Sequence, residues 1–182
     1  HRQCRRQRQM CIRDSLNTAN RNYELIPIFK DYKFVIIDSN TQRILSDSNF
    51  NQKKELCYTA AKNMNIENLC VKSKIDKHDI QSLSDDELSV SKHVIEENIR
   101  VVKAAQFLKS NGAEEFGKLM TESHMSLSKY YKVSTLELDK LVDLANSFGA
   151  LGSKLTGAGF GGAIVTLVKK ELVEELKKYI PV

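Results

Sequence analysis

The glycine-rich run LTGAGFGGAIVTLV, residues 155–168, constrains this 182-residue chain more than any other segment. It holds four of the chain's eight glycines and continues directly into six apolar or β-branched residues, 163–168. Because glycine lacks a Cβ atom, its backbone can take positive φ values, and another loop or an anion can approach it closely. The six residues that follow are typical of a buried strand. The sequence therefore predicts a glycine loop that leads into a buried strand.

The spacing of Gly157, Gly159 and Gly162 satisfies G-x-G-x-x-G, but the order of elements argues against a dinucleotide-binding fold. That fold needs a strand before the glycines and a helix after them, so that the pyrophosphate meets a helix N-terminus. The sequence also contains no G-x-x-x-x-G-K-[ST] phosphate loop. Spacing alone leaves two interpretations open: a loop that approaches another loop or an anion, and a tight strand connection without a ligand.

Positive charge is concentrated at the start of the chain. Residues 1–15 hold five arginines and one aspartate, which supply +4 of the formal net charge of +5. This segment has the pattern of neither a signal peptide nor a transit peptide. We expect residues 1–15 to be a non-native or disordered basic segment and residues 16–182 to form one domain. The alternative, a basic arm that binds nucleic acid, is disfavoured because the rest of the chain is nearly neutral.

Apolar runs and cysteines exclude two further classes of protein. No apolar run approaches the roughly 18 residues that span a membrane. Cys57 and Cys70 have neither C-x-x-C spacing nor a nearby histidine at metal-ligand distance. We therefore expect reduced thiols, no metal ligands and a cytoplasmic location, without nucleic-acid or membrane partners.

Hydrophobic periodicity predicts strands near both ends of the chain and helices between them. Period-2 and continuous apolar runs predict strands at 22–28, 33–38, 150–156 and 163–168, with the first two as neighbours in a small antiparallel sheet and 43–45 able to pair with them. Apolar residues at i, i+3 and i+4 predict helices over 50–64, 94–108, 116–127, 134–148 and 172–180. This order is typical of an α+β domain, an antiparallel sheet with helices on one face.

The clearest predicted helix start is at Ser134. Ser134 and Glu137 have the S-x-x-E spacing of a capping box, and Gly149 is placed for the left-handed residue that ends the helix. We expect Glu137 and Asp139 to stabilise the helix start rather than to act as acid or base.

Few side chains are candidates for chemistry. Ser123 and His124 fall on an apolar helix stripe, where they could serve a site, although a hydrogen-bonded polar pair in the core is the favoured interpretation. Glu96 and Glu97 are expected to face water. The sequence assembles no Ser/His/Asp set, metal cluster or pair of facing carboxylates with any specificity.

Four segments resemble, in order and spacing, successive parts of galactokinases, sugar kinases of the GHMP superfamily. The segments are FVIIDSNTQRILSDSNFNQKKELC (34–57), SKHVIEENIRVVKAAQFLKSN (91–111), EEFGKLMTESHMSLSKYYKVSTLELDKLVDLA (114–145) and GALGSKLTGAGFGGAIVTLV (149–168). The resemblance covers nearly everything after residue 15. It implies the carboxy-terminal portion of such an enzyme, with the GHMP kinase C-terminal fold and its ferredoxin-like core.

The resemblance also implies a function. Galactokinases phosphorylate galactose at its C1 hydroxyl with ATP and Mg²⁺. The family's galactose-recognition signature, Gly-Leu-Ser-Ser-Ser phosphate loop and catalytic aspartate do not occur in this sequence. We therefore expect no catalytic residue here, no activity of the chain alone, and a monomer at full length. Three alternatives stay open: a sugar sensor without turnover, a kinase for a related sugar such as N-acetylgalactosamine, and a free-standing interaction module.

Two sets of site residues follow from the resemblance. The third GHMP motif, expected to support the nucleotide loop, is matched by Gly157, Ala158, Gly159, Phe160, Gly161 and Gly162. Phe50 stands where the family pattern DSxYN usually has a tyrosine whose hydroxyl contacts the sugar, so it is the expected substrate-binding residue, without that donor. The SHMSL segment, 123–127, matches a family motif and is expected to have a structural role at the wall of the site.

Overall fold

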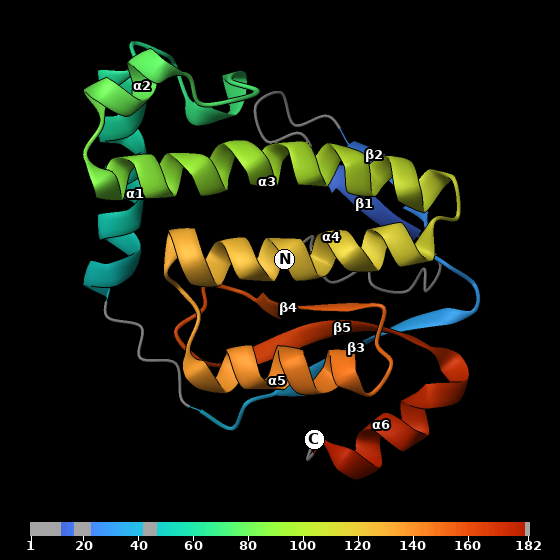
Figure 1. Cartoon of the computed structure of the whole chain (residues 1–182). Helices are drawn as coiled ribbons and strands as arrows, with labels where there is room; N and C mark the ends of the chain where they lie inside the picture. The colour runs from blue at the N-terminus through green and yellow to red at the C-terminus, as the bar shows by residue number, and fades with distance from the viewer. Residues whose placement is uncertain (1–11, 17–22, 42–46, 181–182) are drawn as a thin grey trace, which may run out of the picture.

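The computed structural model describes residues 12–16, 23–41 and 47–180 (Figure 1). The strands are β1 (Ile12–Leu16), β2 (Tyr23–Pro27), β3 (Tyr32–Asp38), β4 (Gly152–Thr156) and β5 (Ala163–Lys169). The helices are α1 (Asp47–Asn63), α2 (Lys77–Ser82), α3 (Asp85–Lys109), α4 (Ala113–Ser126), α5 (Leu136–Ser147) and α6 (Val173–Tyr179). Strands near both ends and helices between them make the α+β fold that the sequence predicted.

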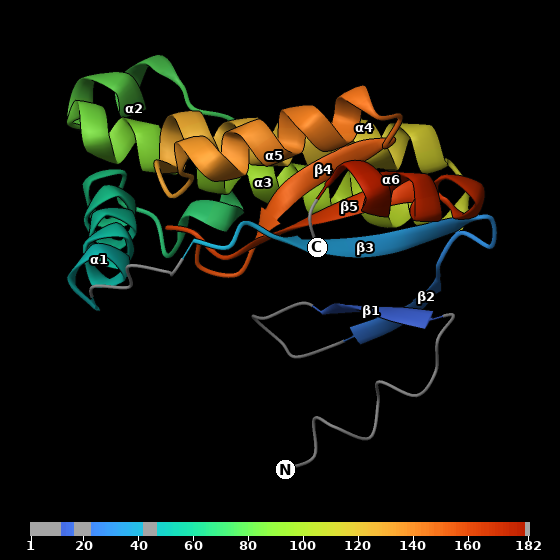
Figure 2. The same cartoon turned by 90° about the horizontal axis from the view of Figure 1, so that it is seen from below.

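The main sheet has three antiparallel strands in the order β3-β5-β4. Its central strand pairs Ile164 with Ile37 on one side and with Leu155 on the other. Residues directly opposite each other point to the same face of a sheet, so these three side chains form one apolar row. Helices α5 and α6 cover that row, and Figure 2 shows them on one side of the strands, with the β1–β2 ribbon on the other. The buried helix residues are Leu138, Val142, Ala145, Val173 and Leu176.

Helix α4 lies along the outer edge of β4, and two glycines permit the close approach. A Cβ atom on Gly152 would overlap the carbonyl oxygen of Gly117, and one on Gly117 would overlap the carbonyl of Leu151. Backbone therefore meets backbone at this point. On the face of the sheet away from α5, Phe116 of α4 stacks edge-to-face on Phe34 of β3.

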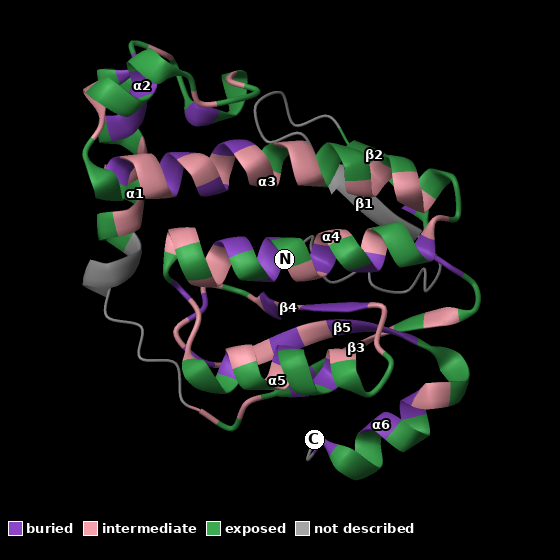
Figure 3. Ribbon diagram, in the orientation of Figure 1, coloured by how far each residue is buried: buried purple, intermediate pink, exposed green. Residues whose placement is uncertain are grey.

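A second apolar cluster joins the helices away from the sheet. Ala60 and Ala61 of α1, with Met64 just after it, pack against Ile95 of α3 and against Leu69 in the connecting segment. Figure 3 shows the buried residues along β4 and on the inward faces of α3 and α4. Helix α3 thus has the helical cluster at one end and α4 along its length, so it ties the two parts of the domain together.

The predicted pairing of 22–28 with 33–38 is wrong. Strand β2 pairs with β1, in the register Arg13 opposite Ile26, and β3 pairs with β5. The predicted end of the basic segment at residue 15 therefore falls inside β1. Pairing uses backbone N–H and C=O groups, so a strand can form where the side chains gave no signal. Residues 1–11 and 43–45 lie outside the described part of the chain.

The predicted helices are present, but α5 begins one residue later than its capping pattern indicated. Thr135, not Ser134, is the N-cap, and its hydroxyl accepts the N–H of Leu138. The Ser134 hydroxyl is used elsewhere, because it donates to Asp139 at 2.5 Å. Gly149 has the expected left-handed backbone, with φ of 91°. The segment 65–85 has no predicted element, and the structure has α2 there. The capping box of Ser84 with Glu87 starts α3 at Asp85, before the predicted 94.

The contact between α4 and β4 leads to a stability prediction. Gly152→Ala places a methyl group against the Gly117 carbonyl, so α4 must shift, and we expect a loss of about 3 kcal/mol or more in the free energy of unfolding. Gly112→Ala is the matched control. Its methyl group meets only side-chain atoms at 3.2 Å, so the loss should be no more than about 1 kcal/mol. Urea unfolding measures both; equal losses would contradict the backbone contact.

Candidate functional site

The glycine loop, 157–162, connects β4 to β5 with an almost wholly left-handed backbone. The φ angles are 81° at Gly157, 81° at Gly159, 56° at Phe160, 107° at Gly161 and 85° at Gly162. L side chains rarely adopt such angles, which is why four of these five positions are glycine. The loop therefore has a backbone conformation that few other sequences could form.

The protein's own backbone contacts the loop on one side. Phe160 N–H donates to the Val133 carbonyl at 2.7 Å, and a Cβ atom on Gly159 would overlap that same carbonyl. Gly162 N–H donates to the Thr41 carbonyl at 3.2 Å, and its own carbonyl accepts Ser39 N–H at 2.7 Å. The close approach predicted from the glycines is thus present, and the segments that approach are 133 and 39–41 of this chain. The support of a nucleotide loop by these residues stays a prediction.

Ser123 and His124 are buried polar residues, as the helix pattern indicated, but each has its own partners. His124 Nδ1 accepts the N–H of Leu155 at 3.2 Å, and its Nε2 lies 3.1 Å from an oxygen of Asp139. Burial lowers the pKa of His124, against the raising effect of the Asp139 charge, so the ring is neutral near neutral pH. Asp139 therefore does more than stabilise the start of its helix.

Glu97 does not face water, contrary to the prediction. Its carboxylate accepts the Ser123 hydroxyl at 2.5 Å, the Lys154 ammonium at 3.2 Å and the Arg100 Nε–H at 2.8 Å. Burial alone would raise the pKa of Glu97, but Lys154, Ser123 and Arg100 outweigh it and lower the pKa to about 2. A carboxylate held ionised in this way is a weak base. We interpret the cluster of Glu97, Arg100, Ser123 and Lys154 as a set of polar contacts that joins α3, α4 and β4.

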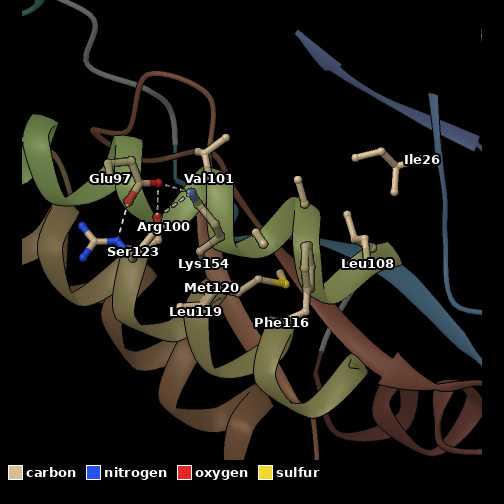
Figure 4. A pocket seen from close by; sticks show the side chains of 12 residues that line it. Ile26, Glu97, Arg100, Val101, Leu108, Phe116, Leu119, Met120, Ser123 and Lys154 are labelled. Carbon is tan, nitrogen blue, oxygen red and sulfur yellow. Dashed lines mark hydrogen bonds and ion pairs between the residues drawn. The ribbon is translucent and has the colours of Figure 1, made fainter. Parts of the chain in front are cut away.

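A cavity of about 250 Å³ adjoins this cluster. Figure 4 shows Glu97, Ser123 and Lys154 at one end, with Leu108, Phe116 and Met120 along the rest. Ligand sites usually measure about 300–1,000 Å³. Glu97, Ser123 and Lys154 in this one bond to each other, and Arg100 Nη2 has no hydrogen-bond partner among the described residues. The cavity is therefore too small and too apolar for a nucleotide.

Phe50, the expected substrate-binding residue, lies in the first turn of α1, and its side chain is outside the described residues. Among the residues described, no group of three or more His, Cys, Asp or Glu could hold a metal ion. Cys57 and Cys70 are free thiols, as expected. No helix within the described ranges is both long and apolar enough to cross a membrane.

Comparison with known proteins identifies the family to which the chain is similar. Residues 104–181 match the family model for GHMP kinases C terminal. The chain is 40% identical to the galactokinase of Clostridium acetobutylicum over 79% of its own length and 39% of that protein's. It is 36% identical to the galactokinase of Thermotoga petrophila, over 90% of the chain and 49% of that protein. The chain thus spans at most about half the length of these curated relatives.

A solved structure gives the same result in three dimensions. Lactococcus lactis galactokinase complexed with galactose superimposes with a TM-score of 0.82 at 29% identity, over 93% of this chain and 46% of that one. Together, the antiparallel sheet, its helices and the glycine loop define a GHMP kinase C-terminal domain. Within that class, the chain belongs with the carboxy-terminal part of the galactokinases, which confirms the resemblance of its motifs.

The buried histidine His93 leads to a prediction about pH. Its Nδ1 is 2.9 Å from the Ser126 hydroxyl, and burial lowers its pKa from 6.5 to about 4. Between these two values the unfolded chain binds a proton that the folded chain does not. Stability should therefore fall as the pH drops from about 6.5 to about 4, with this residue contributing about 3 kcal/mol. His93→Asn keeps a hydrogen-bonding group near Ser126 but cannot titrate.

Urea unfolding of both proteins at several pH values measures this effect. The wild type should lose about 3 kcal/mol more than His93→Asn across the window from pH 7 to pH 4. A difference between the two that stays constant over that window would contradict a neutral, buried His93.

Proposed function

We propose that the protein containing this chain is a galactokinase, which transfers the γ-phosphoryl group of ATP to the C1 hydroxyl of galactose. One observation carries the proposal: the similarity to galactokinases extends over 79% or more of the chain and includes the glycine loop. Because the chain spans under half of those proteins, the activity belongs to the whole protein rather than to these 182 residues.

In this proposal the glycine loop, 157–162, supports the segment that holds the ATP phosphates. The loop is bonded to Val133, Ser39 and Thr41, which leaves its remaining backbone to meet a neighbouring loop. Glycine suits this role because another backbone can come within hydrogen-bonding distance of it. Phosphoryl transfer depends mainly on positioning and on neutralising charge, so a rigid support contributes to catalysis without touching the reacting atoms.

MgATP, when bound, supplies the phosphoryl group. In this proposal the loop backbone supports the segment that holds the nucleotide, and no group of three or more His, Cys, Asp or Glu among the described residues could hold a metal ion. We propose no metal ligand and no catalytic residue among the described residues. The sugar and ATP are its proposed partners, and a cytoplasmic monomer is the proposed state of the whole protein.

An assay of two proteins tests the proposal. The 182 residues alone should release no ADP from ATP with galactose, because their sequence contains no phosphate loop and no catalytic aspartate of the family. The protein from the complete reading frame should release ADP when galactose is added. Galactose binding without turnover by that complete protein would favour the sugar-sensor alternative. Turnover by the 182 residues alone would contradict the proposal that the activity requires the whole protein.

Phe50 leads to a prediction about sugar affinity. If its ring lies against the sugar, as the family pattern implies, Phe50→Tyr in the complete protein restores a hydroxyl donor. One hydrogen bond to an uncharged group contributes about 0.5–1.5 kcal/mol, so the KM for galactose should fall by about two- to tenfold. The KM for ATP should not change. Tyr58→Phe, an opposite change at an exposed position of the same helix, is the control.

An unchanged or higher KM for galactose would contradict the role of Phe50. A lower KM for N-acetylgalactosamine alone would favour that sugar as the substrate.

A further inference from the structure

Among the described residues, no strand pairs with the outer edge of β4, yet two of its backbone donors have acceptors. The N–H groups of Ser153 and Leu155 donate to side chains of α4, namely Thr121 Oγ1 at 3.4 Å and His124 Nδ1 at 3.2 Å. These two α4 residues therefore take the place of a neighbouring strand. His124 holds the position nearest to the glycine loop, because Leu155 is two residues before Gly157.

The other side of the same imidazole ring leads to the far end of the loop. His124 Nε2 is 3.1 Å from Asp139 Oδ1, in a bent contact rather than a straight hydrogen bond. Asp139 also accepts the Ser134 hydroxyl at 2.5 Å and the Ser128 hydroxyl at 2.9 Å. Ser134 follows Val133, whose carbonyl accepts the N–H of Phe160 within the loop. The contacts thus run from Leu155 through His124, Asp139 and 133–134 back to the loop.

The protonation of His124 fits this arrangement. A nitrogen that accepts a backbone N–H cannot carry a proton, so the neutral ring has its hydrogen on Nε2, which faces the Asp139 carboxylate. The side chain is only 5% exposed. Buried imidazoles oriented in this way by a carboxylate have a fixed tautomer and a fixed ring position.

From this geometry we infer that His124 and Asp139 are positioning residues, which hold the glycine loop, 157–162, in the conformation that supports the nucleotide. The claim that the loop supports a nucleotide rests on the proposed function. The claim that His124 and Asp139 fix the conformation of the loop does not. Neither residue touches the reacting groups in this inference. The simpler alternative is that the pair stabilises the domain without any special effect on the loop.

Three variants separate the contact of His124 with Leu155 from its contact with Asp139. His124→Gln loses the acceptor for Leu155 and keeps a polar group near Asp139, whereas His124→Asn keeps the acceptor and loses the reach to Asp139. Asp139→Asn removes the charge at a position where the side chain is 39% exposed, so this variant should fold even if a change of His124 does not. His93→Asn is the control, because His93 is an equally buried histidine that bonds to Ser126 and not to the loop.

Amide hydrogen exchange of the folded 182-residue chain measures the hold on the loop directly. We expect exchange at 155–162 to speed up by about three- to tenfold in His124→Gln and Asp139→Asn, the effect of one lost hydrogen bond. Exchange there should be unchanged in His93→Asn, even if that variant melts at a lower temperature. Equal exchange at 155–162 in all the variants and the wild type would overturn the inference.

Kinetics of the complete protein test the link to the nucleotide. The KM for ATP should rise by about three- to tenfold in the same two variants, with the KM for galactose unchanged. A loss of active protein without a change in the KM for ATP would indicate a stabilising role only and would contradict the positioning role. If the complete wild-type protein has no kinase activity, the proposed function fails, and the exchange measurement still decides whether His124 and Asp139 hold the loop.

Discussion

The backbone contact between Gly117 of α4 and Gly152 of β4 is the constraint on which the rest of the structure depends. It brings α4 so near to the sheet edge that short side chains can reach the strand. Gly117, Thr121 and His124 are spaced i, i+4 and i+7, so they share one face of the helix. Along β4 they meet Gly152, Ser153 and Leu155 in turn. A helix held farther away could not supply acceptors to this edge.

The same contact explains why the polar groups of the domain gather between α3, α4 and β4. Ser123, next to His124 on α4, meets Lys154 at 2.6 Å, and both bond to Glu97 of α3. A charge that is partly removed from water is stabilised by pairing and hydrogen bonds, and the half-buried Glu97 carboxylate has two cations and a hydroxyl as partners. The result is a hydrogen-bonded and ion-paired cluster that joins α3, α4 and β4. The glycine loop follows β4, and its conformation is set by backbone contacts rather than by side chains of its own.

Local sequence signals predicted the elements well, and distant contacts account for what they missed. The glycine run, the apolar run in 33–38 and the i, i+3, i+4 stripe of 94–108 each depend on neighbours in sequence, and each appears in the structure. The surroundings of Glu97 depend on Lys154, 57 residues away, so no local pattern could show that its carboxylate is partly buried and paired. The partner of β2 was equally unpredictable, because a turn between two strand-like runs indicates a hairpin but does not require one. The substrate-binding role of Phe50 was inferred from the resemblance alone, and it stays a prediction.

The central claim is that backbone contacts with Val133, Ser39 and Thr41 fix the glycine loop on one side, so that its remaining backbone can support a nucleotide. Amide hydrogen exchange of the complete protein, with and without a non-hydrolysable ATP analogue and Mg²⁺, tests it most directly. The account predicts slower exchange at 157–162 when the nucleotide is bound, with no change in the turn between α3 and α4, 110–112, which lies at the opposite end of α4 from the loop (Figure 1). If the analogue binds and exchange in the loop stays the same, the loop does not support the nucleotide and the account is wrong.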